Sequence, residues 1–479
     1  MSATFDHRNR YLISGGTLPD GTMADVLIED GLLAAVGPDA RTRAGATPES
    51  GAGAGAGTAE VIDATGRILL PGLVDLHTHL RQPGREDAET VETGTRAAAL
   101  GGFTSVHAMA NSTPVADSAG VVEQVWQLGR EAGWCDVHPV GAVTVGLGGE
   151  RLAELGAMAQ SRAEVRVFSD DGMCVWDPVL MRRALEYVKA FDGVIAQHAQ
   201  EPRLTDGAQM NEGALSSVLG LAGWPAVAEE AIIARDVLLA QHVGSRLHVC
   251  HVSTAGSVEI IRWAKERGIE VTAEATPHHL LLTEELVRTY NPVYKVNPPL
   301  RREQDVMALR EGLADGTIDT IGTDHAPHTA ETKECEWTVA AMGMTGLETA
   351  LPVVQQALVD TGLMDWAGIS RILSSTPARI ARLADQGRIS PEGVFEVGAP
   401  ANLTVYDPTV TRTVDPESHA TKARNSPFRG MELPGQVTDV FNHGHPVVRD
   451  RALATPRSQH QQNQHQQNQH QQQTGSAQQ

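Results

Sequence analysis

The chain contains few cysteines, few aromatic residues and an excess of negative charge. Each of these features excludes some kinds of protein or partner. Its four cysteines are widely spaced and form no CxxC pair, which predicts free thiols in a reducing compartment. A formal net charge of −21 argues against nucleic acid or an anionic membrane as a main partner. Aromatic residues make up 4% of the chain against 41% hydrophobic residues overall, so aliphatic side chains must fill the core.

Long apolar segments are also missing. No run of about 18 apolar residues occurs, and the first residues carry no apolar stretch typical of a signal peptide. We therefore expect a soluble, cytoplasmic protein without a membrane partner. At 479 residues the chain exceeds one average domain, and a barrel alone needs about 250 residues, so one large and one smaller domain are expected.

The two ends of the chain have a similar pattern of short strand-like segments and turns. Short strand-like runs separated by glycine and aspartate fill residues 1–70, and the same style resumes over 386–455. We expect these ends to pair into one small flanking β-sandwich, with residues 41–59, rich in Ala and Gly, as a flexible loop. The Gln/His-rich residues 456–479 are predicted to be disordered.

Strand-like and helix-like segments alternate over residues 71–385. Glu89–Leu100 and Val121–Ala132 read as helices, and Phe103–Ala108 and Val137–Val143 as strands between and after them. Eight such strands with intervening helices predict an α/β fold, a (β/α)8 TIM-type barrel.

Two histidines separated by one residue end the first apolar run of this region. Side chains alternate between the faces of a strand, so His77 and His79 point the same way, close enough to share a metal ion. Buried histidines that only complete a core are the alternative. Four later apolar runs also end in metal-capable residues, which favours a metal site at the C-terminal rim of the barrel. These residues are Asp170 and Asp171, His198, His251, and Asp324 with His325 and His328.

These motifs resemble the cyclic amidohydrolases, and most closely the dihydroorotases of the long bacterial type. The matching blocks follow one another from about residue 62 to 430. They are Asp75-Leu76-His77-Thr78-His79-Leu80-Arg81, Met109-Ala110-Asn111-Ser112-Thr113-Pro114, Phe168-Ser169-Asp170-Asp171-Gly172, His248-Val249-Cys250-His251-Val252-Ser253, Val296-Asn297-Pro298-Pro299-Leu300-Arg301 and Gly322-Thr323-Asp324-His325-Ala326-Pro327-His328.

The resemblance implies two zinc ions per subunit. His77, His79 and Asp324 would hold one zinc, His198 and His251 the other, and Asp171 would bridge them. Asp170 is the rival for the bridge, because adjacent residues face opposite ways. Cys250 is excluded as a ligand on the same alternation argument, since it precedes His251 on a strand.

Departures from the family and its relatives bear on this assignment. Related hydantoin and dihydropyrimidine hydrolases bridge their metals with a carboxylated lysine on the fourth strand, and this chain has no lysine there. Gln200 stands where an acidic residue often follows the histidine of strand five, which leaves the support of His198 open.

Arg81 follows the histidine pair by two residues and should share its face. A buried guanidinium needs an anion, and a substrate carboxylate suits its planar fork; an internal salt bridge is the alternative. The resemblance implies that Asn111 and His328 complete this clamp, that Asn297 binds the amide edge of the ring, and that His79, Met342 and Gly343 also contact the substrate.

The implied activity is reversible cyclisation of N-carbamoyl-L-aspartate to L-dihydroorotate plus water, in de novo pyrimidine (UMP) biosynthesis. Asp324 would act as the catalytic general acid/base. An allantoinase or hydantoinase is the alternative enzyme, and a non-catalytic dihydroorotase-like subunit of an aspartate transcarbamoylase complex is the alternative of another class. A homo-oligomer and an aspartate transcarbamoylase partner are expected from the family.

Overall fold

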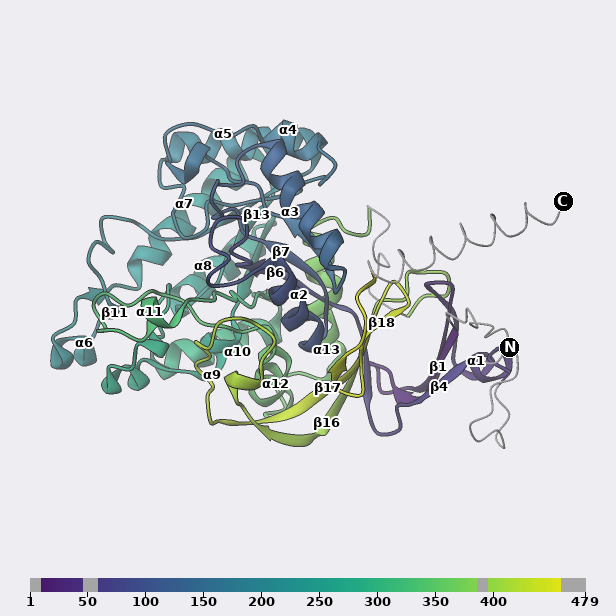
Figure 1. Cartoon of the computed structure of the whole chain (residues 1–479). Coiled ribbons are helices and arrows are strands. Elements are labelled where there is room, and N and C mark those ends of the chain that lie inside the picture. Colours follow the sequence, from purple (N-terminus) through teal and green to yellow (C-terminus); the bar gives the residue numbers. More distant parts are fainter. Residues whose placement is uncertain (1–9, 46–58, 386–394, 458–479) are drawn as a thin grey trace.

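The computed structural model describes residues 10–45, 59–385 and 395–457, which form a mixed α/β protein. A β-sheet built from the two chain ends lies to one side of a larger body of parallel strands and helices (Figure 1). None of the helices in these ranges is long and apolar enough to cross a lipid bilayer.

The smaller part is a single nine-stranded sheet to which both chain ends contribute. Its order is β19-β18-β17-β16-β5-β1-β2-β3, with β4 paired in parallel to β1. The ends of the chain meet where β5 pairs antiparallel with β16, in the register Leu69 to Val405. The strands are β1 (Arg10–Thr17), β2 (Met23–Glu29), β3 (Leu32–Val36), β4 (Glu60–Asp63), β5 (Ile68–Pro71), β16 (Leu403–Thr413), β17 (Glu432–Asn442), β18 (His445–Arg449) and β19 (Ala452–Leu453). The sequence predicted a sandwich, and the pairing gives one continuous sheet.

The larger part contains a three-stranded and a five-stranded sheet, ordered β6-β7-β8 and β15-β14-β13-β10-β9, with all their pairings parallel. Parallel bridges connect Gly141 to Phe168 at one junction and Thr78 to His325 at the other, so the pairings run in a ring. The strands are β6 (Leu73–Thr78), β7 (Phe103–Ala108), β8 (Asp136–Pro139), β9 (Val167–Phe168), β10 (Val194–Gln197), β13 (Leu247–Val249), β14 (Val271–Ala275) and β15 (Thr320–Ile321).

Helices connect each of these strands to the next. Local sequence sets their ends: α2 begins at a Thr90 capping box, and α3 and α7 end at Gly133 and Gly244 in the left-handed conformation. The connecting helices are α2 (Val91–Leu100), α3 (Ala119–Ala132), α4 (Leu155–Gln160), α5 (Pro178–Val188), α7 (Val227–Val243), α8 (Ala255–Glu266) and α10 (Glu303–Asp315). Their apolar faces join the strands in one buried cluster, as aliphatic core packing requires.

Short elements complete the described chain. The pair β11 (Met210–Asn211) and β12 (Gly223–Trp224) lies in the connection before α7, with α6 (Ala214–Leu219) between them. The remaining helices are α1 (Pro38–Arg43), α9 (Pro277–Leu281), α11 (Ala330–Lys333), α12 (Ala350–Val354), α13 (Trp366–Ser370) and α14 (Thr376–Ile380).

Some predicted boundaries differ from the observed ones. Strand β7 has the predicted bounds, whereas β8 and β15 are shorter than the apolar runs that predicted them. The predicted loop 41–59 begins inside α1, and its residues 46–58 lie outside the described ranges, as do 386–394 and 458–479.

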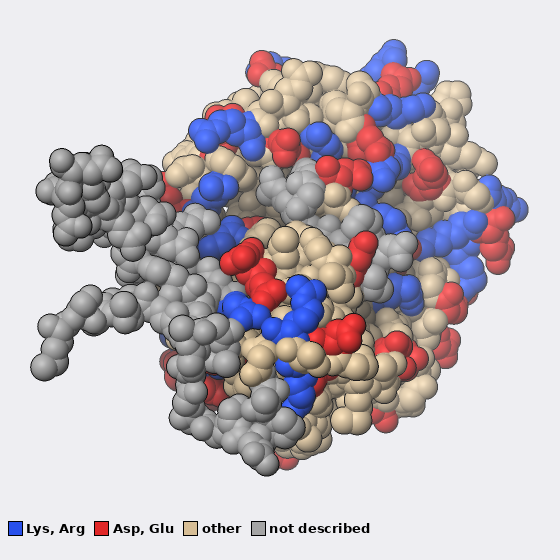
Figure 2. Space-filling model, turned by 90° about the vertical axis from the view of Figure 1, so that its right-hand side faces the viewer, with Lys and Arg blue, Asp and Glu red and all other residues tan. Residues whose placement is uncertain are grey.

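Charge is distributed without a dominant patch on the face drawn in Figure 2, where acidic and basic side chains intermingle. The described chain also contains ion pairs between side chains close in space, such as Arg182–Glu186 and Arg262–Asp315. The negative net charge is therefore not gathered into one acidic surface on this face.

Candidate active site

The six predicted metal ligands lie at the carboxyl ends of five parallel strands. His77 is the second-to-last residue of β6, and each of the other ligands follows the end of its strand within a few residues. They are His79 after β6, Asp171 after β9, His198 after β10, His251 after β13 and Asp324 after β15. Because parallel strands present their carboxyl ends at one rim, residues up to 247 positions apart in sequence come together.

Asp171 lies at the centre of this group. Its Oδ1 is 3.2 Å from His77 Nε2, 3.3 Å from His198 Nδ1 and 3.5 Å from His251 Nε2, and its Oδ2 is 3.3 Å from His79 Nε2. Two groups of potential ligand atoms share this carboxylate, one with His77 and His79, the other with His198 and His251. This arrangement has the donor set of a divalent-metal site.

Asp324 faces the first of these groups. Its Oδ1 is 3.1 Å from His79 Nε2 and 3.5 Å from His77 Nε2. Burial alone would raise the pKa of Asp324, but the positive charge on His77 and the contact with His79 hold that pKa below its usual range. The carboxylate is therefore ionised at neutral pH.

Two buried ligand atoms lack a hydrogen-bond partner in the described part of the chain, His77 Nε2 and Asp171 Oδ1. Buried polar atoms are nearly always paired, so an unpaired nitrogen facing an unpaired carboxylate oxygen needs an explanation. A divalent cation between them would satisfy both atoms. The residues present thus fit a metal, which agrees with the predicted metal dependence.

Hydrogen bonds behind the histidines fix which ring nitrogen faces the centre. His77 Nδ1 donates to Glu274 Oε1 at 2.6 Å, and His198 Nε2 donates to Gln200 Oε1 at 2.7 Å. Since these oxygens can only accept, the ring nitrogen that faces the centre is the one that would lose its proton and bind a metal. Gln200, a departure from the expected acidic residue, thus performs the same orienting contact through its amide oxygen.

Glu274 is a functional residue that the sequence analysis missed. It lies in β14, completely buried, and besides His77 it contacts His248 Nε2 at 3.2 Å and the His251 backbone N–H at 3.3 Å. A glutamate inside the apolar run Val271–Ala275 was the available signal, because a buried carboxylate needs partners.

The stated reason for excluding Cys250 as a ligand is wrong. Its Sγ lies in a group of potential ligand atoms with His77 and Glu274, all within 4.8 Å of one another. Strand β13 ends at Val249 and His251 has a positive φ of 32°, so the alternation of a strand does not extend to these residues. Burial raises the pKa of the Cys250 thiol to about 12, which keeps it protonated.

Asp170, the rival for the bridging position, has its carboxylate engaged elsewhere. Its Oδ1 accepts from the Val143 and Thr144 backbone N–H groups at 2.7 and 3.0 Å, and its Oδ2 accepts from the Thr144 hydroxyl. The side chain therefore fastens the chain after β8 to the chain after β9.

Arg81 is a half-buried cation beside the cluster. Its Nε donates to the Pro327 carbonyl at 3.1 Å, and within the described ranges no carboxylate lies at ion-pair distance from its guanidinium. Desolvation lowers the pKa of Arg81 to about 10, so the group is still charged at neutral pH. A partly desolvated guanidinium without a carboxylate partner favours an anionic ligand over the internal salt bridge considered as the alternative.

His328 lies next to Arg81, with 3.5 Å between His328 Nε2 and Arg81 Nη2. Burial and the positive charge of Arg81 lower the pKa of His328 to about 3, so its ring is neutral. Its Nε2 lies 2.9 Å from the Met342 carbonyl, which can only accept, so Nε2 carries the proton. Gly343 packs against the same ring: a Cβ there would lie 2.7 Å from His328 Nε2.

The two predicted asparagines lie beside different histidines of the cluster. Asn111 accepts from His79 Nδ1 at 3.0 Å through Oδ1, and its Nδ2 has a long contact of 3.4 Å to the Asp171 carbonyl. Asn297 donates to Gln200 Oε1 at 3.0 Å, beside His198. Both predicted substrate residues therefore lie next to candidate metal ligands.

Comparison with known proteins gives a consistent family. The model of the family described as "Dihydro-orotase-like" matches residues 66–257. A dihydroorotase of Streptomyces coelicolor is 63% identical over 445 residues, covering 93% of this chain and 100% of that protein. A dihydroorotase of Mycobacterium tuberculosis is 55% identical over 431 residues, covering 90% of this chain and 96% of that protein.

Solved structures show the same fold at lower identity. A dihydropyrimidinase from Brevibacillus agri has a TM-score of 0.78 at 25% identity, covering 94% of this chain and 97% of that one. An L-hydantoinase from Arthrobacter aurescens has a TM-score of 0.79 at 24% identity, covering 94% and 98%. The fold is thus that of cyclic amide hydrolases.

Proposed function

This chain belongs to the dihydroorotase family, and from that membership we propose that it interconverts N-carbamoyl-L-aspartate and L-dihydroorotate in de novo pyrimidine biosynthesis. It is a cyclic amide hydrolase. The observation that carries the choice of substrate is the half-buried Arg81 guanidinium, which has no carboxylate partner in the described chain and lies beside a cluster of metal-capable side chains.

The ring of parallel pairings supports a closed (β/α)8 barrel as the scaffold. Three strands and five strands are connected at both junctions by parallel bridges, and a helix follows nearly every strand. In such barrels the active site is at the carboxyl ends of the strands, where the candidate ligands lie.

We propose that the predicted ligands bind two zinc ions. His77, His79 and Asp324 would hold one ion, His198 and His251 the other, with Asp171 between them. The shared position of Asp171 and the engagement of Asp170 elsewhere support this division. When bound, such ions lower the pKa of a water toward neutrality and polarise a carbonyl oxygen.

Asp324 is the proposed general acid/base. Ionised in the resting site, its carboxylate accepts a proton from the water whose oxygen bonds to the ring carbonyl carbon of dihydroorotate. As the carbonyl carbon–nitrogen bond breaks, the same proton passes from Asp324 to the departing ring nitrogen. Ring closure of carbamoyl-aspartate runs through these steps in reverse and releases water.

Arg81 and the neighbouring polar groups orient the substrate. The guanidinium would bind the substrate carboxylate through two parallel N–H donors, and Asn111 Nδ2 and the His328 ring lie beside it. Asn297, Met342 and Gly343 would line the ring. Holding the carboxylate fixes which carbonyl meets the reactive water.

Steady-state rates on dihydroorotate, allantoin and hydantoin test the assignment. We expect turnover of dihydroorotate at least about a hundred-fold above the neutral rings in kcat/KM, because only dihydroorotate provides the carboxylate that Arg81 needs. Turnover of allantoin or hydantoin alone would overturn the proposed function. Absence of all activity in metal-loaded protein would favour the non-catalytic subunit instead.

Arg81→Lys separates recognition of the carboxylate from chemistry. We expect KM for dihydroorotate to rise about ten-fold or more with kcat changed much less, because a lysine ammonium cannot form the paired contacts of a guanidinium. Arg85→Lys is a matched control, since Arg85 is exposed and pairs with Asp87 on the surface. An unchanged KM in Arg81→Lys would assign the residue to structure.

Five expectations stay predictions: the identity of the metal as zinc, the number of two ions, the homo-oligomer, the aspartate transcarbamoylase partner and the cytoplasmic location. Metal analysis of the purified protein and its mass in solution would test the first three.

A further inference from the structure

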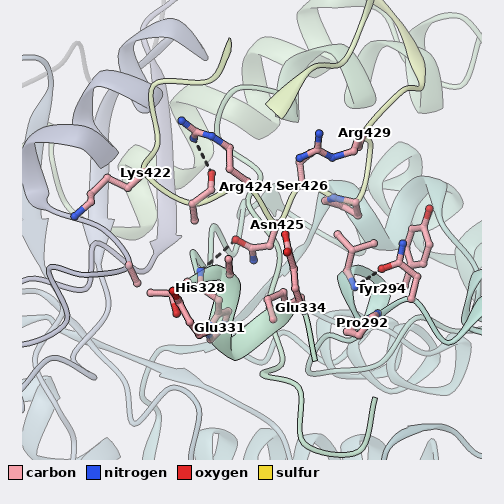
Figure 3. A pocket seen from close by; sticks show the side chains of 18 of the residues that line it. Pro292, Tyr294, His328, Glu331, Glu334, Lys422, Arg424, Asn425, Ser426 and Arg429 are labelled. Carbon is pink, nitrogen blue, oxygen red and sulfur yellow. Dashed lines mark hydrogen bonds between the residues drawn. The ribbon is translucent and has the colours of Figure 1, made fainter. Parts of the chain in front are cut away.

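A cavity of about 950 Å³ adjoins the predicted substrate residues at His328. Four chain segments line it: Asp87–Ala88, Asn291–Tyr294, a stretch that includes His328–Glu331 and a stretch that includes Lys422–Pro427. The last of these belongs to the long connection between β16 and β17, two strands of the small sheet. Asn425 on this connection points toward His328 in Figure 3.

The Asn425 side chain makes three hydrogen bonds to two active-site backbone segments. Its Oδ1 accepts from the His328 N–H at 3.1 Å, and its Nδ2 donates to the Ala326 and Gly343 carbonyls at 3.0 and 3.1 Å. The residue is 5% exposed. One acceptor facing an N–H and two donors facing carbonyls is a pattern that only an amide side chain provides.

These three contacts fix the segment that contains His328 against the segment that contains Met342 and Gly343. The backbones are also joined directly, by Ala326 N–H to the Met344 carbonyl at 2.7 Å. Gly343 in turn donates to the Lys295 carbonyl at 3.0 Å. The His328 ring, with its Nε2 proton on the Met342 carbonyl, therefore has its position set by contacts to both segments.

The connection that carries Asn425 is itself anchored beside the site. Glu89, fully buried, accepts from the Lys422 backbone N–H at 3.1 Å and from the Thr421 hydroxyl, and it contacts His325 Nε2 at 3.3 Å. His325 directly follows Asp324. The connection between β16 and β17 is thus held to the active-site rim at two points, by its contacts with Glu89 and through its own Asn425.

We propose that Asn425 is a positioning residue for substrate recognition, holding His328 and the Gly343 backbone in the geometry that binds the substrate carboxylate and ring. The inference rests on the proposed function above. Asn425 touches neither a candidate metal ligand nor the reacting atoms, so its contribution is to substrate binding rather than to the proton transfer.

Asn425→Asp is the sharpest test, because it keeps the shape and the acceptor for His328 N–H but replaces Nδ2, which carries both donors, with one oxygen that faces the Ala326 and Gly343 carbonyls. We expect KM for dihydroorotate to rise about ten-fold, with kcat changed less than three-fold and metal content equal to wild type. Ser426→Ala is the matched control: its hydroxyl contacts only the Phe428 N–H in the described chain, so both constants should stay within two-fold.

A double-mutant cycle shows whether the effect passes through His328. In a His328→Ala background, Asn425→Asp should raise KM no more than about three-fold further, because the ring that it positions is already missing. Asn425→Ser introduces a hydroxyl that can accept and removes the amide donors. Its KM and kcat provide the same test if Asn425→Asp does not fold.

The outcomes separate this inference from the proposed function. If wild type turns over dihydroorotate but the Asn425 variants keep its KM and lose kcat only in proportion to folded protein, the role is structural and the inference is overturned. KM effects that multiply fully with those of His328→Ala would overturn it as well. If wild type does not act on dihydroorotate, the proposed function itself fails.

Discussion

Asp324→Asn is expected to lower kcat about a thousand-fold in both directions of the reaction, with the protein still folded. The amide keeps the size of the carboxylate and a neutral oxygen, but it cannot take the proton that must move from water to the ring nitrogen. General acid/base groups contribute about 10²–10⁴-fold to rate, and a weakened metal ligand adds to the loss.

The measurement is kcat for cyclisation and for hydrolysis, paired with metal analysis of the same sample. Asp319→Asn is the matched control from the same chain segment, because Asp319 pairs with Lys265 at 2.6 Å and receives the Ala273 N–H, remote from the predicted ligands. Its kcat should stay within about three-fold of wild type. More than a tenth of the wild-type kcat in metal-loaded Asp324→Asn would refute the proton-transfer role.

Asp171→Asn should change metal content itself. Four imidazoles lie within 3.5 Å of this carboxylate, and its charge is what a second cation would need if both ions share it. We expect bound metal to fall from about two ions per chain to about one or fewer, and turnover to fall at least about a hundred-fold.

The neighbouring Asp170→Asn provides the contrast within one motif. Its amide oxygen can still accept from the Val143 and Thr144 N–H groups, and the hydrogen bonds of the Asp170 carboxylate go to these residues rather than to candidate ligands. We expect full metal content and at least half of the wild-type turnover. Loss of metal from Asp170→Asn, with retention in Asp171→Asn, would reverse the assignment of the bridge.

Much of the scaffold was predictable from local patterns. Strand β7 and helix α2 follow directly from apolar periodicity, and their predicted positions agree with the structure to within two residues. Apolar runs overestimated β8 and β15, because strand limits depend on where neighbouring strands stop pairing rather than on hydropathy. The two chain ends were predicted to pair, and β5 and β16 join them in one sheet.

Local sequence patterns also predicted some residues of the candidate site and missed others. The His77–His79 spacing and the placement of acids and histidines at strand ends predicted which side chains gather, since each signal is local. Glu274 and Asn425 were missed, because their partners His77 and His328 lie 197 and 97 positions away. The error on Cys250 arose from extending the alternation of β13 past its last residue.

Strand periodicity and the direction of parallel strands are local properties, so they predict which residues could bind metal and at which rim these residues meet. The use of each side chain depends on contacts between distant segments. Asp171 faces the histidines while Asp170 holds the backbone after β8, Gln200 orients His198, and Asn425 contacts the His328 N–H from the connection between β16 and β17. Hydrogen bonds are short and directional, so such partners are set only when these segments fold against one another.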